Sequence, residues 1–329
     1  MKVAVIGVGS MGKNHARIYF NNESVQLIGV ADPDPEAVAK IARKYNTLAY
    51  CDYKQLLARE DLDAVSIVVP TKYHRDVAIH ALNSGKHVLL EKPIAETEIE
   101  AKEIIECAKR NNKILMIGHI EQFNTAILKL KEKLDQKELG DIYKIDVQRI
   151  GPFPSRVSDV GVIIDLSVHD IDIINFLLDK EPHRIYAETQ QKLHPYHEDS
   201  VIALLRYEDG ILATLNVNYL SPTKIRQLKV FGEKGMFAVD YLNQELRFFE
   251  NSGYRSEQWG SVIEGKMIKY HIKKKEPLEV EIDAFLNCIK NNKMPVVTGE
   301  KGLRALQIAK LFIRSATEKA ILHPDNNEK

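Results

Sequence analysis

The chain has 329 residues, enough for two domains of ordinary size, and a hydrophobic content of 44% predicts sizeable cores. Its 46 basic residues balance 46 acidic ones, so there is no basic excess of the kind that nucleic acid or anionic membranes attract. No apolar run approaches the roughly 20 residues that span a bilayer. The first residues lead directly into an apolar strand rather than a signal peptide, and three scattered cysteines form neither a metal motif nor a disulfide framework. We therefore expect a cytoplasmic protein with no nucleic-acid partner, no membrane partner and no bound metal.

The first 20 residues predict a dinucleotide-binding turn. Residues 2–6 form a β-branched apolar run typical of a buried parallel strand, and residues 13–20 have a helical pattern. Gly7 between them permits a tight turn, Gly9 lets the backbone approach a pyrophosphate, and Gly12 lets the helix pack closely on the strand. The helix N-terminus then faces the phosphate charge.

An acidic residue at the end of the next strand strengthens this prediction. Asp32 ends the strand over residues 26–32, where a carboxylate can accept hydrogen bonds from the hydroxyls of the adenosine ribose. Its charge would repel a 2′-phosphate, and Pro33 and Asp34 supply no compensating cation, which favours NAD over NADP. The alternative is that Asp32 only begins the Asp-Pro-Asp-Pro turn and caps the helix over residues 36–45.

Strands and helices alternate up to residue 118. Strands are expected at 48–50, 64–69, 87–91 and 114–118, and helices at 53–58, 74–84 and 96–111. This rhythm specifies a doubly wound parallel sheet, a Rossmann domain over residues 1–120.

The pattern changes in the second part of the chain. After a helix at 123–134, alternating strands are expected at 142–150, 184–191, 200–207, 211–219, 228–231, 236–240 and 245–250. One helix is inserted at 163–178, and the tail is helical at 281–291 and 301–319. We expect residues 121–329 to form an α+β domain with an open, mainly antiparallel sheet.

Lys92 is the first candidate for chemistry, because it directly follows the strand over residues 87–91, at the edge where open α/β sheets bind ligands. A desolvated lysine can serve as the base that alcohol oxidation by a nicotinamide requires. The alternative is a solvated lysine at a strand end. Pro70 to His74 occupy the turn after the previous strand; His74 either contacts a cofactor or only begins its helix. His119, Glu121 and Gln122 follow the last strand and are expected to line an interdomain cleft.

Asp165 and His169 are four residues apart on the apolar helix at 163–178, so a regular α-helix places them on one face. A carboxylate beside an imidazole makes it more basic, as a proton shuttle requires. Alternatively, Asp165 is a charge favoured by the helix dipole, and His169 an interior histidine. A metal site with Asp172 is conceivable, but no fourth ligand is evident.

Together these motifs resemble the Gfo/Idh/MocA family, the glucose-fructose and inositol dehydrogenase-like oxidoreductases, over almost the whole chain. Glu91-Lys92-Pro93 and Asp165-x-x-x-His169 carry the resemblance most specifically. It implies a second domain of the glucose-fructose oxidoreductase type, NAD as cofactor, a Lys-Pro bond that is often cis, and Lys92, His169 and Asp165 as catalytic residues. It also implies pairing of the open sheets in a homodimer or homotetramer.

Within the family, the segments 118–124 and 151–165 resemble the microbial UDP-N-acetylglucosamine 3-dehydrogenases. This implies oxidation of the 3-hydroxyl of that sugar nucleotide to a 3-keto sugar. An inositol or free-hexose dehydrogenase, a hydrolase or lyase that uses NAD transiently, and a non-catalytic NAD(H) sensor remain alternatives. The residues expected to contact the cofactor are Gly7, Gly9, Ser10, Met11, Gly12, Asp32, Pro70, Thr71, His74, Glu91, Lys92 and Gln122. Those expected to contact the substrate are Lys92, His119, Glu121, Arg156, Asp165, His169 and Lys224, with Arg226 as a further cation that could meet a diphosphate. The alternative for the three cations Arg156, Lys224 and Arg226 is that they are solubilising charges on the surface.

Overall fold

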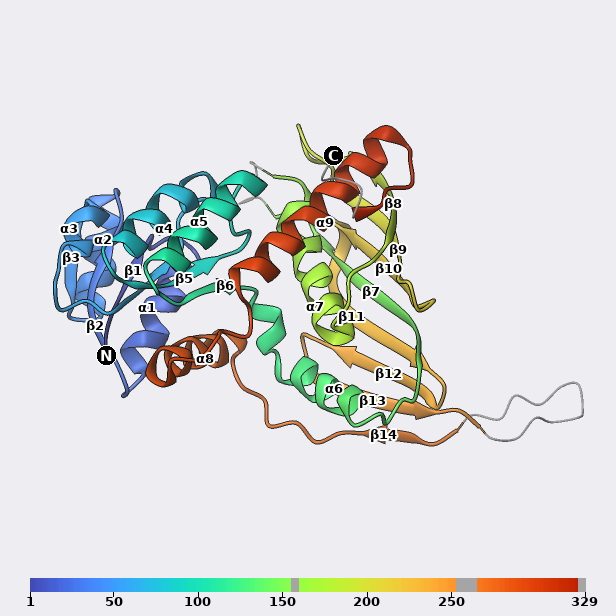
Figure 1. Cartoon of the computed structure of the whole chain (residues 1–329). Helices are drawn as coiled ribbons and strands as arrows, with labels where there is room; N and C mark the ends of the chain where they lie inside the picture. The colour runs from blue at the N-terminus through green and yellow to red at the C-terminus, as the bar shows by residue number, and fades with distance from the viewer. Residues whose placement is uncertain (155–159, 253–264, 325–329) are drawn as a thin grey trace, which may run out of the picture. The chain divides into compact units, whose positions relative to one another are not determined.

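The computed structural model describes residues 1–154, 160–252 and 265–324, and the chain divides into two compact units (Figure 1). The first unit comprises Met1–Ile120 and Glu276–Leu306, and the second comprises Glu121–Lys275 and Gln307–Lys329. The segment Glu276–Leu306, which the sequence pattern assigned to the second domain, thus groups with the first. Helix α8 (Pro277–Asn291) in this segment packs on α1 (Gly12–Asn21), and Asn22 donates a 2.8 Å hydrogen bond to Asp283.

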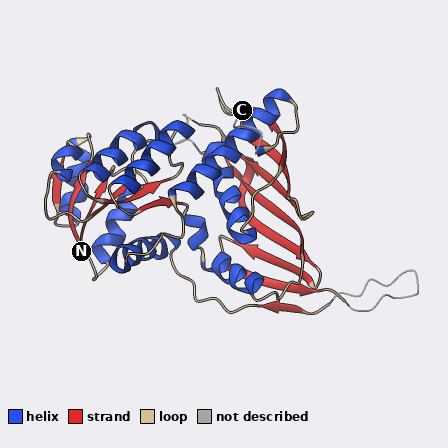
Figure 2. Ribbon diagram, viewed as in Figure 1, coloured by secondary structure: helices blue, strands red, loops and turns tan. Residues whose placement is uncertain are grey.

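A six-stranded parallel sheet forms the centre of the first unit, in the order β3-β2-β1-β4-β5-β6. Its strands are β1 (Lys2–Ile6), β2 (Gln26–Ala31), β3 (Leu48–Tyr50), β4 (Ala64–Ile67), β5 (His87–Glu91) and β6 (Leu115–Gly118). Its other helices are α2 (Pro35–Lys44), α3 (Tyr53–Leu57), α4 (His74–Asn83) and α5 (Glu98–Arg110). Helices α1 and α8 lie on one face and α4 and α5 on the other (Figure 2). The predicted doubly wound fold is confirmed.

The strand order of this sheet reverses between β1 and β4. Strands β2 and β3 follow β1 outward on one side, and β5 and β6 follow β4 outward on the other side. Ligands of open α/β sheets bind outside the carboxyl ends of the strands at such a point. The glycine turn after β1, the turn after β4 and the Glu-Lys-Pro turn after β5 all lie at this edge, because the strands are parallel.

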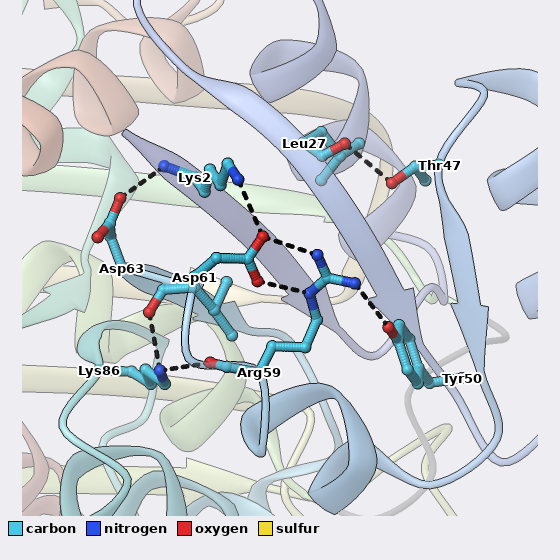
Figure 3. A network of polar contacts seen from close by, with 9 residues as sticks. Lys2, Leu27, Thr47, Tyr50, Arg59, Asp61, Asp63 and Lys86 are labelled. Atoms are coloured by element: carbon cyan, nitrogen blue, oxygen red, sulfur yellow. Dashed lines mark hydrogen bonds and ion pairs between the residues drawn. The ribbon is translucent and has the colours of Figure 1, made fainter.

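A polar network at the opposite edge of the sheet ties the amino ends of the strands together (Figure 3). Asp61 accepts hydrogen bonds from the Lys2 ammonium at 2.9 Å and from the Arg59 guanidinium at 2.8 and 2.9 Å. These hydrogen bonds lower the pKa of Asp61 to about 2. The buried Lys86 ammonium donates to the backbone oxygens of Arg59 and Leu62 at 2.7 and 2.8 Å. This edge is occupied by structural contacts between the strand ends.

An eight-stranded mixed sheet dominates the second unit, in the order β14-β13-β12-β11-β7-β10-β9-β8. Its strands are β7 (Ile142–Pro152), β8 (Arg184–Gln190), β9 (Ser200–Arg206), β10 (Leu212–Asn218), β11 (Leu220–Gly232), β12 (Gly235–Asp240), β13 (Glu245–Glu250) and β14 (Met267–Lys269). The mainly antiparallel sheet is confirmed, except that β7 and β10 pair in parallel. A turn that contains Asp209 and Gly210 joins β9 to β10, with Gly210 at φ 93°.

Two strands differ from the sequence pattern. Strand β11 begins eight residues earlier than expected, at Leu220, which pairs with Pro152 of β7; the register then shifts, and regular pairing resumes at Ile225. The segment between Leu220 and Ile225 contains Pro222, which cannot donate to a ladder and made the segment look like a loop. Strand β14 was missed because it has only three residues and all of them are exposed.

Helices cover one face of the large sheet (Figure 2). They are α6 (Thr125–Asp135), α7 (Val168–Leu178) and the second half of α9 (Gly299–Glu318), and a short 3-10 helix, η2 (Ile120–Phe123), precedes α6. On β9, Val201, Ala203 and Leu205 are buried, whereas Ile202 and Leu204 on the other face are 62% and 42% exposed. In the described residues, no helix is long and apolar enough to cross a membrane.

Candidate functional site

The glycine turn after β1 has the geometry that a dinucleotide requires. Gly7 adopts φ 90°, and a Cβ there would lie 2.5 Å from the backbone oxygen of Val68. A Cβ on Gly12 would lie 1.8 Å from the oxygen of Gly7, so the close packing of α1 on β1 depends on this glycine. A Cβ on Gly9 would meet nothing within 4 Å, which leaves open space where a pyrophosphate can approach. Ser10 and Met11 next to it are exposed at the N-terminus of α1.

Asp32 supports this turn directly. One oxygen of its carboxylate accepts a 2.8 Å hydrogen bond from the backbone N–H of Val8, and the other oxygen accepts a 3.0 Å hydrogen bond from the backbone N–H of Asp34. The cap of helix α2 is Asp34, whose side chain accepts from Glu36 and Ala37. Asp32 therefore does not cap the helix, and its carboxylate stands beside the glycine turn at the carboxyl end of β2.

The turn after β4 holds His74 inside the unit. Pro70 is exposed and begins a short 3-10 helix, η1 (Thr71–Tyr73), that leads into α4. His74 is 1% exposed; its Nδ1 lies 2.8 Å from the backbone oxygen of Pro93 and its Nε2 lies 3.0 Å from that of Val69. Burial lowers the pKa of His74, although the two carbonyls act in the opposite direction. His74 thus connects the turns after β4 and β5 at the carboxyl edge of the sheet, and its side chain does not project from that edge toward a ligand.

The Glu-Lys-Pro turn is fixed from inside the sheet. The Lys92–Pro93 bond is cis, as the resemblance stated above implies, and Lys92 is partly exposed. Glu91 accepts a 3.2 Å hydrogen bond from the backbone N–H of Lys92 and contacts Nε2 of His15 on α1 at 3.1 Å. Burial raises the pKa of Glu91, but the His15 hydrogen bond and the positive charges of His15 and Lys92 outweigh it, so the pKa lies below its usual value.

In the second unit, Asp165 lies on a π-helix, η3 (Ile163–Ser167), which continues into α7. The expectation of one regular α-helix over residues 163–178 is therefore wrong at its N-terminal end. Single π turns of this kind often occur at functional sites. The buried Asp165 carboxylate accepts a 2.6 Å hydrogen bond from the phenol of Tyr219, the residue between β10 and β11.

His169 is in the first turn of α7 and is 9% exposed. Asp172, three residues later, is buried and accepts a 2.7 Å hydrogen bond from the side-chain amide of Gln122. Gln122 is itself 1% exposed, so its amide is engaged within its own unit. No group of three or more metal-binding side chains with the geometry of a metal site occurs in the described parts of the chain.

Asp170, the residue after His169, belongs to a cluster of buried charged side chains. Arg149 on β7 is 2% exposed and binds Asp170 at 2.8 Å and Glu121 at 2.9 Å. Its guanidinium also lies over the ring of Tyr241, 5.3 Å from the centroid. Burial lowers the pKa of Arg149, but the two carboxylates outweigh it and keep the guanidinium charged. Arg226 on β11, which is opposite Arg149 in the sheet, binds Glu121 at 3.2 Å.

The predicted site residues not yet described are Lys224, His119 and Arg156. Lys224 is exposed on β11, two residues before Arg226, and its side chain packs over Gly151. His119 is 1% exposed at the end of β6. Arg156 lies outside the described residues. The structure thus assigns the glycine turn, Asp32, His74, Lys92 and His119 to the first unit, and Glu121, Gln122, Asp165, His169 and Lys224 to the second.

Sequence reasoning missed His15, Arg149 and Tyr219. The first two carried a signal: Arg149 follows Ile145 and Val147 on the buried side of an alternating strand, and His15 lies on the apolar side of α1. A charged or polar group at such a position needs a buried partner. Tyr219 ends a strand, and nothing in the sequence pairs it with Asp165.

Two family models match the chain. One, described as an oxidoreductase family NAD-binding Rossmann fold, matches residues 1–119, and the other, the C-terminal alpha/beta domain of the same family, matches residues 131–322. The chain belongs to the Gfo/Idh/MocA oxidoreductase family. Its first unit is an NAD-binding Rossmann domain.

Individual relatives agree with this assignment. The chain is 31% identical to the UDP-N-acetylglucosamine 3-dehydrogenase of Acidithiobacillus ferrooxidans, over 97% of both chains. A solved structure of that enzyme superimposes with a TM-score of 0.86, at 30% identity and over 97% of this chain and 98% of the other. The NAD⁺-dependent scyllo-inositol 2-dehydrogenase of Bacillus subtilis is 26% identical, over 91% of this chain and 89% of its own length. Both relatives are sugar or cyclitol dehydrogenases by name.

Proposed function

We propose that this protein uses NAD to oxidise a secondary hydroxyl of a sugar nucleotide, and that the 3-hydroxyl of UDP-N-acetylglucosamine is its target. The observation that supports the substrate most is the likeness to the Acidithiobacillus ferrooxidans enzyme, which extends through both units at 31% identity.

Oxidation of an alcohol separates a hydride from carbon and a proton from oxygen. The glycine turn and Asp32 would hold NAD, which would serve as the hydride acceptor. We assign the proton to Lys92 and His169, with Lys92 nearest the reacting oxygen and His169 as base or relay. Asp165 orients His169 and is held by Tyr219, so its carboxylate stays in one position and supports positive charge on the imidazole.

Cations on β11 suit the diphosphate of a sugar nucleotide. Lys224 and Arg226 lie two residues apart on this strand, Lys224 in its irregular first part and Arg226 opposite Arg149 of β7. Burial and the neighbouring Arg149 lower the pKa of Arg226. Although it contacts Glu121, the Arg226 side chain is 32% exposed to solvent. A guanidinium binds phosphate oxygens through several N–H donors, so we propose Arg226 and Lys224 as diphosphate contacts.

An inositol or free hexose is the second candidate substrate, because the scyllo-inositol dehydrogenase covers nearly the same length of the chain. The test is NADH formation at about 340 nm with UDP-sugars, inositols and free hexoses at matched concentrations. We expect the highest kcat/KM with UDP-N-acetylglucosamine. A higher value with an inositol or a free hexose would replace the sugar nucleotide by that class.

The residues disfavour a serine hydrolase and a purely NAD(H)-sensing protein, whereas a hydrolase or lyase that uses NAD transiently remains an alternative. Ser66, His15 and Glu91 are arranged like a serine-hydrolase triad, with 3.1 Å between Ser66 Oγ and His15 Nδ1 and 3.1 Å between His15 Nε2 and Glu91. However, Ser66 and His15 are both 0% exposed, so a substrate cannot reach this hydroxyl. A purely NAD(H)-sensing protein would have no use for both Lys92 and His169. Conversion of a substrate with no net NADH would favour the hydrolase or lyase class instead.

We also propose that the protein forms a homodimer or homotetramer through the face of the large sheet opposite α6 and α7. Ile202 and Leu204 on this face are exposed apolar side chains on a strand whose other side is core. Multi-angle light scattering should give two or four times the monomer mass, and replacing both residues with lysine should give monomers. A monomer of the unmodified protein at micromolar concentration would contradict this proposal.

A further inference from the structure

Two arginines lie opposite each other on neighbouring strands of the large sheet. Arg149 on β7 and Arg226 on β11 are paired in the antiparallel ladder, within the regular stretch from Ile225 to Phe231. The Cβ atoms of such a pair are about 4.5–5.5 Å apart, and like charges at this distance repel each other. Arg149 is buried, so water screens its charge little. The two guanidinium groups therefore need a carboxylate between them.

Glu121 provides this carboxylate. Its Oε1 accepts a hydrogen bond from Nη1 of Arg149 at 2.9 Å and another from Nη1 of Arg226 at 3.2 Å. Arg149 is fixed on its other side by Asp170, which accepts from its Nε at 2.8 Å, and by the ring of Tyr241 beneath its guanidinium. The result is a series of alternating charges with no net charge, which runs Asp170, Arg149, Glu121, Arg226.

The Arg226 end of this series is accessible to solvent. Asp170 and Arg149 are buried, whereas 32% of the Arg226 side chain is exposed. In the described part of the chain, the other nitrogens of the Arg226 guanidinium make no hydrogen bond. Burial and the charge of Arg149 lower the pKa of Arg226, but an arginine in a protein keeps its proton at neutral pH. The series therefore presents a charged group whose orientation is fixed and whose remaining N–H donors are available to a ligand.

These donors lie near Asp165 of the same unit. Burial has the largest effect on the pKa of Arg226 and lowers it, while the charges of Glu121, Asp170 and Asp165 act in the opposite direction. Asp165 is thus close enough to Arg226 for the two charges to interact. In a sugar nucleotide the diphosphate is attached to C1, two ring positions from C3. A substrate whose C3 hydroxyl lies at Asp165 and His169 therefore has its diphosphate within reach of Arg226.

We propose that Glu121 and Arg149 are positioning residues for Arg226: they hold its guanidinium in the orientation that binds the diphosphate of the substrate. An arginine that is already held loses less rotamer freedom when it binds an anion, so less affinity is lost to ordering the side chain. Glu121 thereby acts on the substrate through Arg226 and not, as the sequence suggested, by direct contact. The inference rests on the proposed function for the identity of the anion, but its test measures binding without turnover.

The test is the affinity for UDP, measured by isothermal titration calorimetry in the presence of NADH. Arg226→Ala should weaken UDP binding about tenfold, the effect of losing a hydrogen bond between charged groups. Glu121→Ala should weaken it by a similar factor, because the Arg226 side chain is then free to turn and is repelled by Arg149. Lys229→Ala is the matched control, since it removes an exposed cation three residues further along β11, and it should not change the affinity.

Further variants separate positioning from a general structural effect. If Glu121 acts through Arg226, adding Glu121→Ala to Arg226→Ala should cause no further loss of UDP affinity. Glu121→Gln keeps an acceptor oxygen at the same reach and should restore most of the affinity that Glu121→Ala loses. Circular dichroism establishes that each variant is folded. If Glu121→Ala does not fold, Arg226→Lys decides: it keeps the charge but not the planar group that Glu121 orients, and it should bind UDP about as weakly as Arg226→Ala.

The proposal is overturned if folded Glu121→Ala or Arg226→Lys binds UDP as tightly as the unmodified protein. It is also overturned if the loss in Glu121→Ala adds in full to that in Arg226→Ala, if Glu121→Gln restores nothing, or if the unmodified protein does not bind UDP. Binding of UDP that depends on Arg226 and Glu121, without oxidation of any UDP-sugar, would contradict the proposed function and leave this inference standing.

Discussion

Tyr219 donates a 2.6 Å hydrogen bond to the carboxylate of Asp165, and both side chains are buried in the second unit. The bond joins the end of β10 to the π-helix that precedes α7. It therefore fixes the direction of the carboxylate four residues before His169, where the helix is not regular. A regular α-helix alone would not determine this direction.

Replacing Tyr219 with Phe should remove this donor and leave a buried carboxylate short of one hydrogen bond. We expect a loss of about 1–3 kcal/mol in the free energy of unfolding. We also expect a lower kcat with unchanged NAD affinity, because the cofactor is bound by the other unit. Tyr143→Phe on β7, where the side chain is 56% exposed, is the control and should change neither quantity. Equal stability and kcat in Tyr219→Phe would show that the bond has no role.

Replacing Arg149 with Met should be strongly destabilising, because Asp170 and Glu121 would be left as buried charges with their main partner gone. Breaking such a pair costs about 3–5 kcal/mol. The double variant with Asp170→Leu should recover part of this loss, since it removes one of the stranded charges. Chemical denaturation of the three proteins checks the prediction. A loss under about 1 kcal/mol in Arg149→Met would mean that water solvates the cluster.

His74 should make the protein less stable in mild acid. Its pKa in the folded state is lowered by burial, so the unfolded chain binds the proton more readily. The stability that neutral His74 provides is complete above the unfolded pKa of about 6.5 and is lost as the pH falls below that value. As the pH is lowered from 7.5 to 5, the urea midpoint of unfolding should therefore fall less steeply in His74→Gln than in the unmodified protein, because the other titratable groups contribute about equally in both. The same slope in both proteins would refute this.

Exchanging Asp32 for Ser should weaken NAD binding and relax the preference for NAD over NADP. The carboxylate holds the Val8 N–H at 2.8 Å and would repel a 2′-phosphate. Loss of a hydrogen bond to a charged group predicts about a tenfold weaker affinity for NAD. Titration of NADH and NADPH fluorescence measures both constants. Tighter binding of NADP than NAD by the unmodified protein would show that the electrostatic argument is wrong.

The fold of both units was readable from the sequence, because it depends on regular patterns. The βα rhythm up to Gly118 gave the parallel sheet, and alternation gave most of the strands of the second one. The parallel pairing of β7 with β10 could not be predicted, since paired residues such as Lys144 and Leu212 are 68 positions apart and alternation is the same for either direction. The place of α8 in the first unit depends in the same way on a distant contact, its packing on α1.

The candidate site was readable only in part. Gly7, Asp32 and Lys92 follow strand ends, and parallel strands bring their carboxyl ends to one edge, so local pattern determines their place. The partners of Asp165 and Glu91 come from 54 and 76 residues away in the sequence, and no local pattern identifies them. The π-helix could not be predicted either, because its residues are those of an ordinary apolar helix.

The central claim is that Lys92 and His169 transfer the proton in an NAD-dependent oxidation. The most direct measurement is the rate of NADH formation from UDP-N-acetylglucosamine by the unmodified protein, Lys92→Ala and His169→Ala, with NAD affinity measured alongside. Each variant should keep its NAD affinity and lose on the order of 100- to 10,000-fold in rate, as expected for a positioned acid–base group. Both variants turning over every accepted substrate at the rate of the unmodified protein would contradict the account.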